Sequence, residues 1–217
     1  MSLTLPEELL LLMLDDSTGR LVDRALAGGD FALAGAVLAE LALQGRVDTD
    51  PTRLFVVNAE PTGNPTLDAV LDQLRASPPG AGSSRSWIEQ LAEDAPALRE
   101  ALFARLVAAG VLRQQDSRFL WMLAERRYPP VSGREEREVK ARLMGVLFQD
   151  DIPEPRDVLL LGLARAADLL GLFLTEEELE RARPRIEQVV RLEELNRSLA
   201  AAVQEIVAQV SRYAYLT

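Results

Sequence analysis

Apolar positions recur with the period of an α-helix along most of this chain. Residues 31–44 read FALAGAVLAELALQ, in which Glu40 is the only charge, so we expect a central helix that is buried on nearly every face. Residues 97–109 and 135–148 are amphipathic, and 158–174 form a second, nearly all-apolar stretch. The pattern therefore predicts a mainly α fold.

Residues with known helix-start and turn preferences divide this pattern into elements. Thr4 and Pro6 are typical of a helix N-terminus, and DDSTG at 15–19 predicts a turn. Residues 53–57 are a strand candidate that could form a small hairpin with 46–47. Further helices are expected at 67–75, from Trp87 onward, at 176–185 and at 192–215, with a flexible loop at 77–84. Together these elements predict a single compact helical domain over 1–217, with a central buried helix, amphipathic helices around it and one or two short β-hairpins.

Residues 110–130, GVLRQQDSRFLWMLAERRYPP, interrupt the helical period. We expect strands at 111–113 and 118–123, joined by a turn at 114–117, which makes 111–123 a candidate protruding hairpin. Alternation along the second strand would place Phe119, Trp121 and Leu123 on one face and Leu120 and Met122 on the other. Because both faces are apolar, one would need a partner outside the core. That partner could be lipid or a second subunit, and the helix–strand–strand order also resembles a winged helix.

The composition removes several kinds of chemistry. The chain has no cysteine and no histidine, which excludes disulfides, thiolate metal sites and imidazole-based nucleophilic catalysis. Carboxylates remain, but Glu7–Glu8, Asp15–Asp16 and Glu176–Glu178 lie at expected helix starts and a turn, where acids are favoured for structural reasons. We therefore expect no metal site, no cofactor and no catalytic residue.

Neither apolar stretch predicts a membrane span. The run 9–14 is too short, and Arg165 and Asp168 interrupt 158–174, each at a cost of about 2.5–3.5 kcal/mol in a bilayer centre. A buried core helix and a cytoplasmic protein are the expectation. Lysine occurs once, at Lys140, against 23 arginines, which favours an origin in a GC-rich bacterial genome.

Charge is distributed unevenly along the chain. The net charge is −10. Residues 99–142 carry ten basic and six acidic residues, a net of +4, whereas the remaining residues carry 14 basic and 28 acidic residues, a net of −14. The overall charge argues against broad nucleic-acid binding, but it allows a locally basic surface on an acidic protein.

An ordered set of short motifs resembles the Golgi phosphoprotein 3 family. LTLPEELLLLMLDDSTG opens the chain, and LAGAVLAELALQGRV, PTGNPTLDAVLDQL, WIEQL, LVAAGVL and LARAADLL follow in the order of the family's own motifs. The matches run from residue 3 to about residue 172. The resemblance implies a compact, mostly helical domain that binds phosphatidylinositol 4-phosphate at a membrane, and a bacterial member of the family.

The resemblance implies that an aromatic residue and several arginines hold the lipid headgroup, as in other members of the family. The corresponding positions here are Ala25, Ala34, Pro96 and Arg99, so that one of the four is retained. The family also carries a protruding β-hairpin for membrane insertion or self-association. The altered positions favour a broader or different acidic lipid for this chain.

We therefore expect a non-enzymatic peripheral membrane adaptor at the inner face of the membrane. We expect anionic phospholipid headgroups to bind to five arginines: Arg99, Arg105, Arg126, Arg127 and Arg165. Membrane insertion, or contact within a homo-oligomer, would use Phe119, Leu120, Trp121 and Met122. Two alternatives stay open: an oligomeric protein-interaction scaffold, and a winged-helix-like regulator whose DNA-phosphate contacts would be Arg113, Arg118, Arg126 and Arg127.

Overall fold

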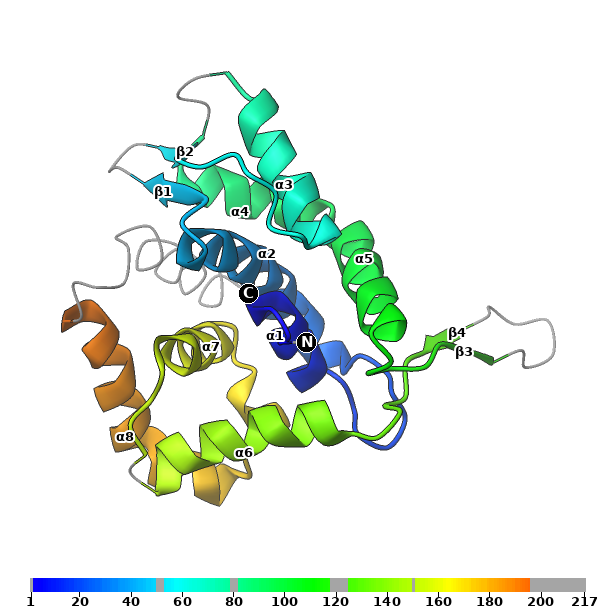
Figure 1. Cartoon of the computed structure of the whole chain (residues 1–217). Helices are drawn as coiled ribbons and strands as arrows, with labels where there is room; N and C mark the ends of the chain where they lie inside the picture. Colours follow the sequence, from blue (N-terminus) through cyan, green and yellow to red (C-terminus); the bar gives the residue numbers. More distant parts are fainter. Residues whose placement is uncertain (1, 50–52, 79–81, 118–124, 150, 196–217) are drawn as a thin grey trace.

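The computed structural model describes residues 2–49, 53–78, 82–117, 125–149 and 151–195. Within these ranges the chain folds into eight α-helices and two short β-hairpins, which confirms the predicted mainly α fold (Figure 1). The helices are α1 Leu5–Leu12, α2 Leu26–Leu43, α3 Pro65–Ala76, α4 Ser84–Glu93, α5 Ala95–Ala108, α6 Arg134–Phe148, α7 Pro155–Ala166 and α8 Glu176–Leu195. Two short 3-10 helices, η1 Asp23–Ala25 and η2 Leu170–Leu172, complete the set.

Helix α2 is the central element, as its all-apolar pattern predicts. It packs against α1, α4 and α7, and Leu33, Leu38 and Leu41 have no exposed surface (Figure 1). The helix begins at Leu26, five residues before the predicted start. Gly28 allows α7 to approach closely, since a Cβ at this position would lie 2.9 Å from the carbonyl oxygen of Ala167.

Short polar motifs begin several of the helices. The backbone N–H of Thr4 donates to the Glu7 carboxylate at 2.7 Å, and Asn64 Oδ1 accepts the backbone N–H of Thr66 at 3.0 Å. At α8, the Glu178 carboxylate accepts from both the N–H and the hydroxyl of Thr175, each at 2.9 Å. Glu7 and Glu178 thus have the structural role that their positions in the sequence suggest.

The predicted helix over 158–174 is wrong in its second half. Helix α7 ends at Ala166, and Asp168 adopts a left-handed conformation with φ 56°. The Leu169 N–H then bonds back to the Ala164 carbonyl at 2.8 Å, which closes the helix end in the way that a C-terminal glycine usually does. Aspartate is one of the few residues that tolerate this conformation, so a single polar position ends an otherwise apolar helix.

Both hairpins are two-stranded and antiparallel. In the first, β1 Val47–Thr49 pairs with β2 Leu54–Val56, as predicted. In the second, β3 Gln115–Ser117 pairs with β4 Glu125–Arg127. The predicted turn at 114–117 is therefore wrong, because most of it is strand. The predicted strand 118–123, with Phe119, Leu120, Trp121 and Met122, lies outside the described residues.

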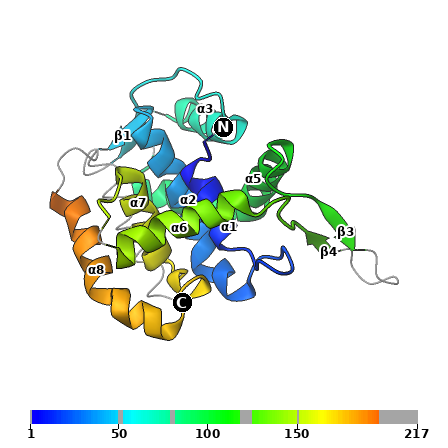
Figure 2. The same ribbon diagram turned by 60° about the horizontal axis from the view of Figure 1, so that its bottom comes forward.

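The root of the β3–β4 hairpin is fixed firmly to the helical body. The ring of Tyr128 stacks on Phe103 of α5 with ring centroids 3.8 Å apart, and its N–H donates to the Gly19 carbonyl at 2.7 Å. Gly19 has a φ of +65°, and a Cβ there would lie 2.4 Å from the nitrogen of Pro129, so only glycine fits. From this root the strands project away from the helices in both orientations of the molecule (Figures 1 and 2).

Candidate anion-binding surface

Arg99 is the one headgroup position that the resemblance finds retained, and it is already paired. Its guanidinium contacts the carboxylate of Asp30, near the start of α2, across 69 positions of sequence. The side chains retain 17% and 24% exposure respectively, so the pair is mostly covered but still reaches solvent. Phe103 lies one turn further along α5, where it stacks on Tyr128, so Arg99 lies close to the hairpin root.

The other positions that the resemblance maps to the headgroup offer little to a charged ligand. Ala25 and Ala34 are buried, with 1% and 0% exposure, and belong to the hydrophobic core. Pro96 is exposed but has no side-chain donor. Among these four positions, only Arg99 can therefore supply a directional donor to a phosphate.

Two further predicted arginines lie on β4, beside Arg99. Arg126 contacts the carboxylate of Glu100 at 2.5 Å, and Glu100 is the residue after Arg99 on α5. This contact raises the pKa of the Arg126 guanidinium. Arg127 is half-buried, and its Nε has no hydrogen-bond partner among the residues that the structure describes. We call Arg99, Arg126 and Arg127 the arginine surface.

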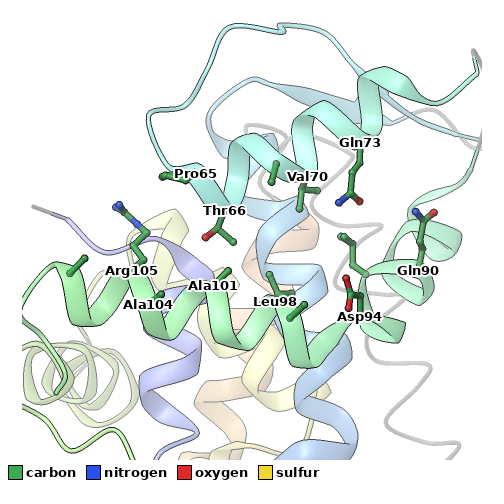
Figure 3. Close-up of a pocket in the computed structure, with 14 residues that line it drawn as sticks. Pro65, Thr66, Val70, Gln73, Gln90, Asp94, Leu98, Ala101, Ala104 and Arg105 are labelled. Carbon is green, nitrogen blue, oxygen red and sulfur yellow. The ribbon is translucent and has the colours of Figure 1, made fainter. Parts of the chain in front are cut away.

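Arg105 lies on a different side of α5, at the edge of a cleft of about 800 Å³. The cleft runs between α3 and α5, and Figure 3 shows Arg105 at one end and Gln73, Gln90 and Asp94 at the other. Its lining is otherwise mostly small and apolar. The Arg105 guanidinium meets the carboxylate of Glu7, which is 1% exposed, at 2.5 Å. Because Glu7 is buried, this contact fixes the Arg105 guanidinium against the core.

Arg165 lies apart from the other four predicted arginines. It lines a cavity of about 200 Å³ with Leu179, Arg183 and Ile186 of α8. Helix α8 and the β3–β4 hairpin lie on opposite sides of the molecule in both views (Figures 1 and 2). The fold thus places Arg126 beside Glu100, the neighbour of Arg99 on α5, with Arg127 next to it on β4, and leaves Arg165 at a distance from them.

Two arginines that sequence reasoning did not single out, Arg142 at 37% and Arg156 at 27% exposure, form an ionic network with buried carboxylates. Arg142 contacts Glu8 at 3.1 Å and Asp157 at 2.5 Å, and Arg156 contacts Glu8 at 3.3 Å and Glu40 at 2.9 Å. These three carboxylates are at most 6% exposed. Burial raises the pKa of Glu8, although the charges and hydrogen bonds of both arginines act in the opposite direction.

A smaller cluster joins α6 to the loop that holds the hairpin root. Lys140 contacts Asp16 at 2.8 Å and Glu136 at 2.6 Å. Burial, together with the hydrogen bond to Asp16, raises the pKa of Glu136 to about 7, and the same hydrogen bond lowers the pKa of Asp16. Gly19, which meets Tyr128, is three residues beyond Asp16, so this cluster fastens the loop beneath the hairpin.

Two absences within the described ranges bear on the kind of site. In these ranges no cluster of three or more His, Cys, Asp or Glu side chains is arranged to hold a metal ion. Over the same ranges, no helix combines the length and the apolar character needed to span a bilayer. In the arginine surface, two of the three arginines carry carboxylate partners.

Comparison with known proteins gives the family. A model of the family described as Golgi phosphoprotein 3 (GPP34) matches residues 5–210. The chain belongs to the Golgi phosphoprotein 3 family. It is also similar to Vacuolar protein sorting-associated protein 74 of Eremothecium gossypii, with 30% identity over 175 residues. The alignment covers 70% of this chain and 51% of that protein, so this Golgi phosphoprotein 3 family member spans about half the length of the curated relative.

The resemblance to the Golgi phosphoprotein 3 family, drawn from the motifs, is therefore confirmed. The motifs gave no sign of Asp30, which contacts the retained arginine, because the two residues are far apart in sequence and each is an ordinary helix-surface residue when read alone.

Proposed function

We propose that the protein is a non-enzymatic peripheral membrane adaptor that binds anionic phospholipid headgroups through its arginine surface. The observation that carries this proposal is the position of Arg99, Arg126 and Arg127 around the fixed root of a projecting hairpin. A phosphate needs directional donors, and guanidinium groups supply them in pairs. Membership of the Golgi phosphoprotein 3 family and similarity to a protein named for vacuolar protein sorting support a role at membranes.

The proposed ligand is an acidic lipid of broader kind than phosphatidylinositol 4-phosphate. A specific headgroup pocket needs several fixed donors, and Ala25, Ala34 and Pro96 supply none. The inner leaflet, where anionic lipids give a negative surface, is the membrane that this chemistry fits. We place Arg165 outside the binding surface because of its distance from the hairpin.

The hairpin would add apolar contact to this electrostatic attraction. Phe119, Leu120, Trp121 and Met122 are large apolar residues in the segment between β3 and β4. One short apolar insertion gives only weak and reversible binding, so that charge or self-association has to contribute as well. The arginine surface at the hairpin root provides that charge, and contact between hairpins of two copies is the alternative use of the same residues.

Sedimentation with lipid vesicles tests the proposal. Wild-type protein should pellet with vesicles that contain phosphatidylserine and remain in solution with phosphatidylcholine alone, and added salt should release it. Arg99→Ala should lower the affinity about fivefold, since one arginine near an anionic surface contributes about 1 kcal/mol. Arg75→Ala is the matched control, because Arg75 is an exposed, carboxylate-paired arginine on α3. Equal pelleting on neutral and acidic vesicles, or none on either, would contradict the proposal.

The same preparation separates the alternatives. Trp121→Ala should weaken vesicle binding if the hairpin inserts into lipid. If it instead lowers the mass measured by light scattering and leaves vesicle binding unchanged, the hairpin serves self-association. A DNA-binding regulator would shift duplex DNA with an affinity that falls steeply with salt.

A further inference from the structure

The arginine surface carries its own counter-ions. Asp30 contacts Nη1 of Arg99, and Glu100 contacts Nη1 of Arg126, so a carboxylate already occupies one donor nitrogen of each guanidinium that a phosphate oxygen could use. A carboxylate and a phosphate compete for the same N–H donors in the same geometry. A lipid phosphate therefore has to displace a carboxylate that the fold holds in place.

The two pairs differ in how strongly they would compete. Arg126 and Glu100 are 54% and 64% exposed, so water and salt screen that pair. Asp30 and Arg99 are 24% and 17% exposed, and each is fixed on a helix of the packed body. The Asp30 carboxylate is consequently the stronger competitor, and it faces the arginine that is the retained headgroup position.

We infer that Asp30 is a built-in competitor that sets the density of anionic lipid at which this protein binds a membrane. The inference rests on the proposed function, because it assigns a second residue to the same surface. While Asp30 holds Arg99, a sparsely charged bilayer offers too little attraction to displace it. A bilayer rich in phosphate groups has enough negative charge close to Arg99 to exchange with the carboxylate.

Partial exposure of the pair makes this exchange physically reasonable. Breaking a fully buried ion pair would leave a charge without water and would be strongly opposed. At Arg99 and Asp30 both side chains still reach solvent, so the released carboxylate can be hydrated. Asp30 would then lie beneath the bound phosphate and repel it, which weakens binding further.

Asp30→Asn tests the inference, because it removes the charge and keeps the size of the side chain. Binding is measured on phosphatidylcholine vesicles that contain an increasing fraction of phosphatidylserine. We expect Asp30→Asn to bind about fivefold more tightly than wild type at intermediate fractions and to reach half-saturation at a lower fraction. Asp30→Glu, which keeps the charge, should bind like wild type.

Two further variants make the test specific to Arg99. Asp72→Asn removes the same charge from an exposed pair on α3 and should not change binding. Arg99→Ala combined with Asp30→Asn should lose the gain, since the released guanidinium is absent. Thermal melting of each variant verifies that it is folded, and Asp30→Ser repeats the test with a smaller neutral side chain if Asp30→Asn is unfolded.

The outcomes distinguish the two proposals. If wild type binds acidic vesicles and Asp30→Asn binds no more tightly, the competitor role of Asp30 is wrong and the proposed function stands. A gain that persists without Arg99, or that Asp72→Asn reproduces, also overturns it, because the effect is then one of net charge. If neither wild type nor Asp30→Asn binds acidic vesicles, the proposed function fails and the inference fails with it.

Discussion

Arginine–carboxylate pairs occur in two settings in this molecule, which differ in how far the carboxylate is covered. In the interior, Glu8, Glu40 and Asp157 are almost fully covered, and Arg142 and Arg156 each contact two of them. On the arginine surface, each guanidinium has one described carboxylate partner or none. Buried charges without partners are costly, whereas exposed charges can exchange partners with water, salt or phosphate.

We infer from this difference which arginines could exchange their carboxylate for a ligand. Arg142 is the last residue of the basic segment 99–142, and Arg156 lies just before the apolar stretch 158–174; the fold uses them to connect α6 and α7 to α1 and α2. Arg105 is held in the same way by Glu7. We therefore expect an arginine to be available to a ligand only where its carboxylate partner also reaches solvent. Asp30, the partner of Arg99, is intermediate between the buried carboxylates and the fully exposed ones.

Removing a buried carboxylate should have the largest effect on the free energy of unfolding. Glu40 accepts hydrogen bonds from the Leu5 N–H at 2.7 Å, from Arg156 at 2.9 Å and from Gln44 at 2.8 Å. Glu40→Ala leaves a buried N–H without its acceptor and removes one of two partners of Arg156. We expect the free energy of unfolding to fall by about 3 kcal/mol, measured by urea denaturation.

Glu60→Ala is the matched control for this change. Glu60 is 79% exposed and pairs with Arg46 at 3.7 Å, so we expect the free energy of unfolding to change by less than about 0.5 kcal/mol. Similar losses in the two variants would show that burial does not separate the interior network from the surface pairs.

The cluster beneath the hairpin should make stability depend on pH. The pKa of Glu136 is raised from 4.5 to about 7, so the folded state holds this proton more tightly than the unfolded chain does. Its contribution to stability is full below pH 4.5 and is lost as the pH rises through about 7. Between pH 5 and pH 8, wild type should lose about 1–3 kcal/mol of unfolding free energy relative to Glu136→Gln.

The groups that face Glu136 decide the sign of this effect. Lys140 favours the charged carboxylate, whereas burial and the neighbouring Asp16 favour the protonated one and act more strongly. Urea denaturation of both proteins across this pH range measures the difference. A difference that stays constant, or grows with pH in favour of wild type, would mean that Lys140 dominates and that Glu136 is charged throughout.

Sequence reasoning found the elements better than it found their contacts. Periodicity located α2 and α5, and the local motif at Thr4 marked a helix start, because these signals involve neighbouring residues. The end of α7 was missed because a single Asp168 in a left-handed conformation leaves no trace in the hydrophobic pattern. The motifs were sufficient for the family because their order extends along the chain.

The candidate surface was predicted only in part, because sequence signals involve neighbouring residues and not contacts between distant ones. Arg99, Arg126 and Arg127 were named, but Asp30 and Glu100 were not, because pairing between distant helices depends on the packing of the whole body. The first strand of this hairpin was predicted at 111–113, whereas β3 lies at 115–117. The apolar run at 119–123 was assigned as the second strand, so the polar residues before it were assigned as the turn. Backbone hydrogen bonds between 115–117 and 125–127 stabilise that ladder whatever the side chains are.

The smallest effect is expected at the most exposed pair of the arginine surface. Glu100→Gln removes the partner of Arg126, and both side chains are more than half exposed, so the melting temperature should change by less than about 2 °C. Binding to acidic vesicles should rise only slightly, by less than Asp30→Asn produces, because water and salt already screen this pair. Calorimetry and vesicle sedimentation on the same sample measure both. A larger gain from Glu100→Gln than from Asp30→Asn would show that Arg126, and not Arg99, makes the principal phosphate contact.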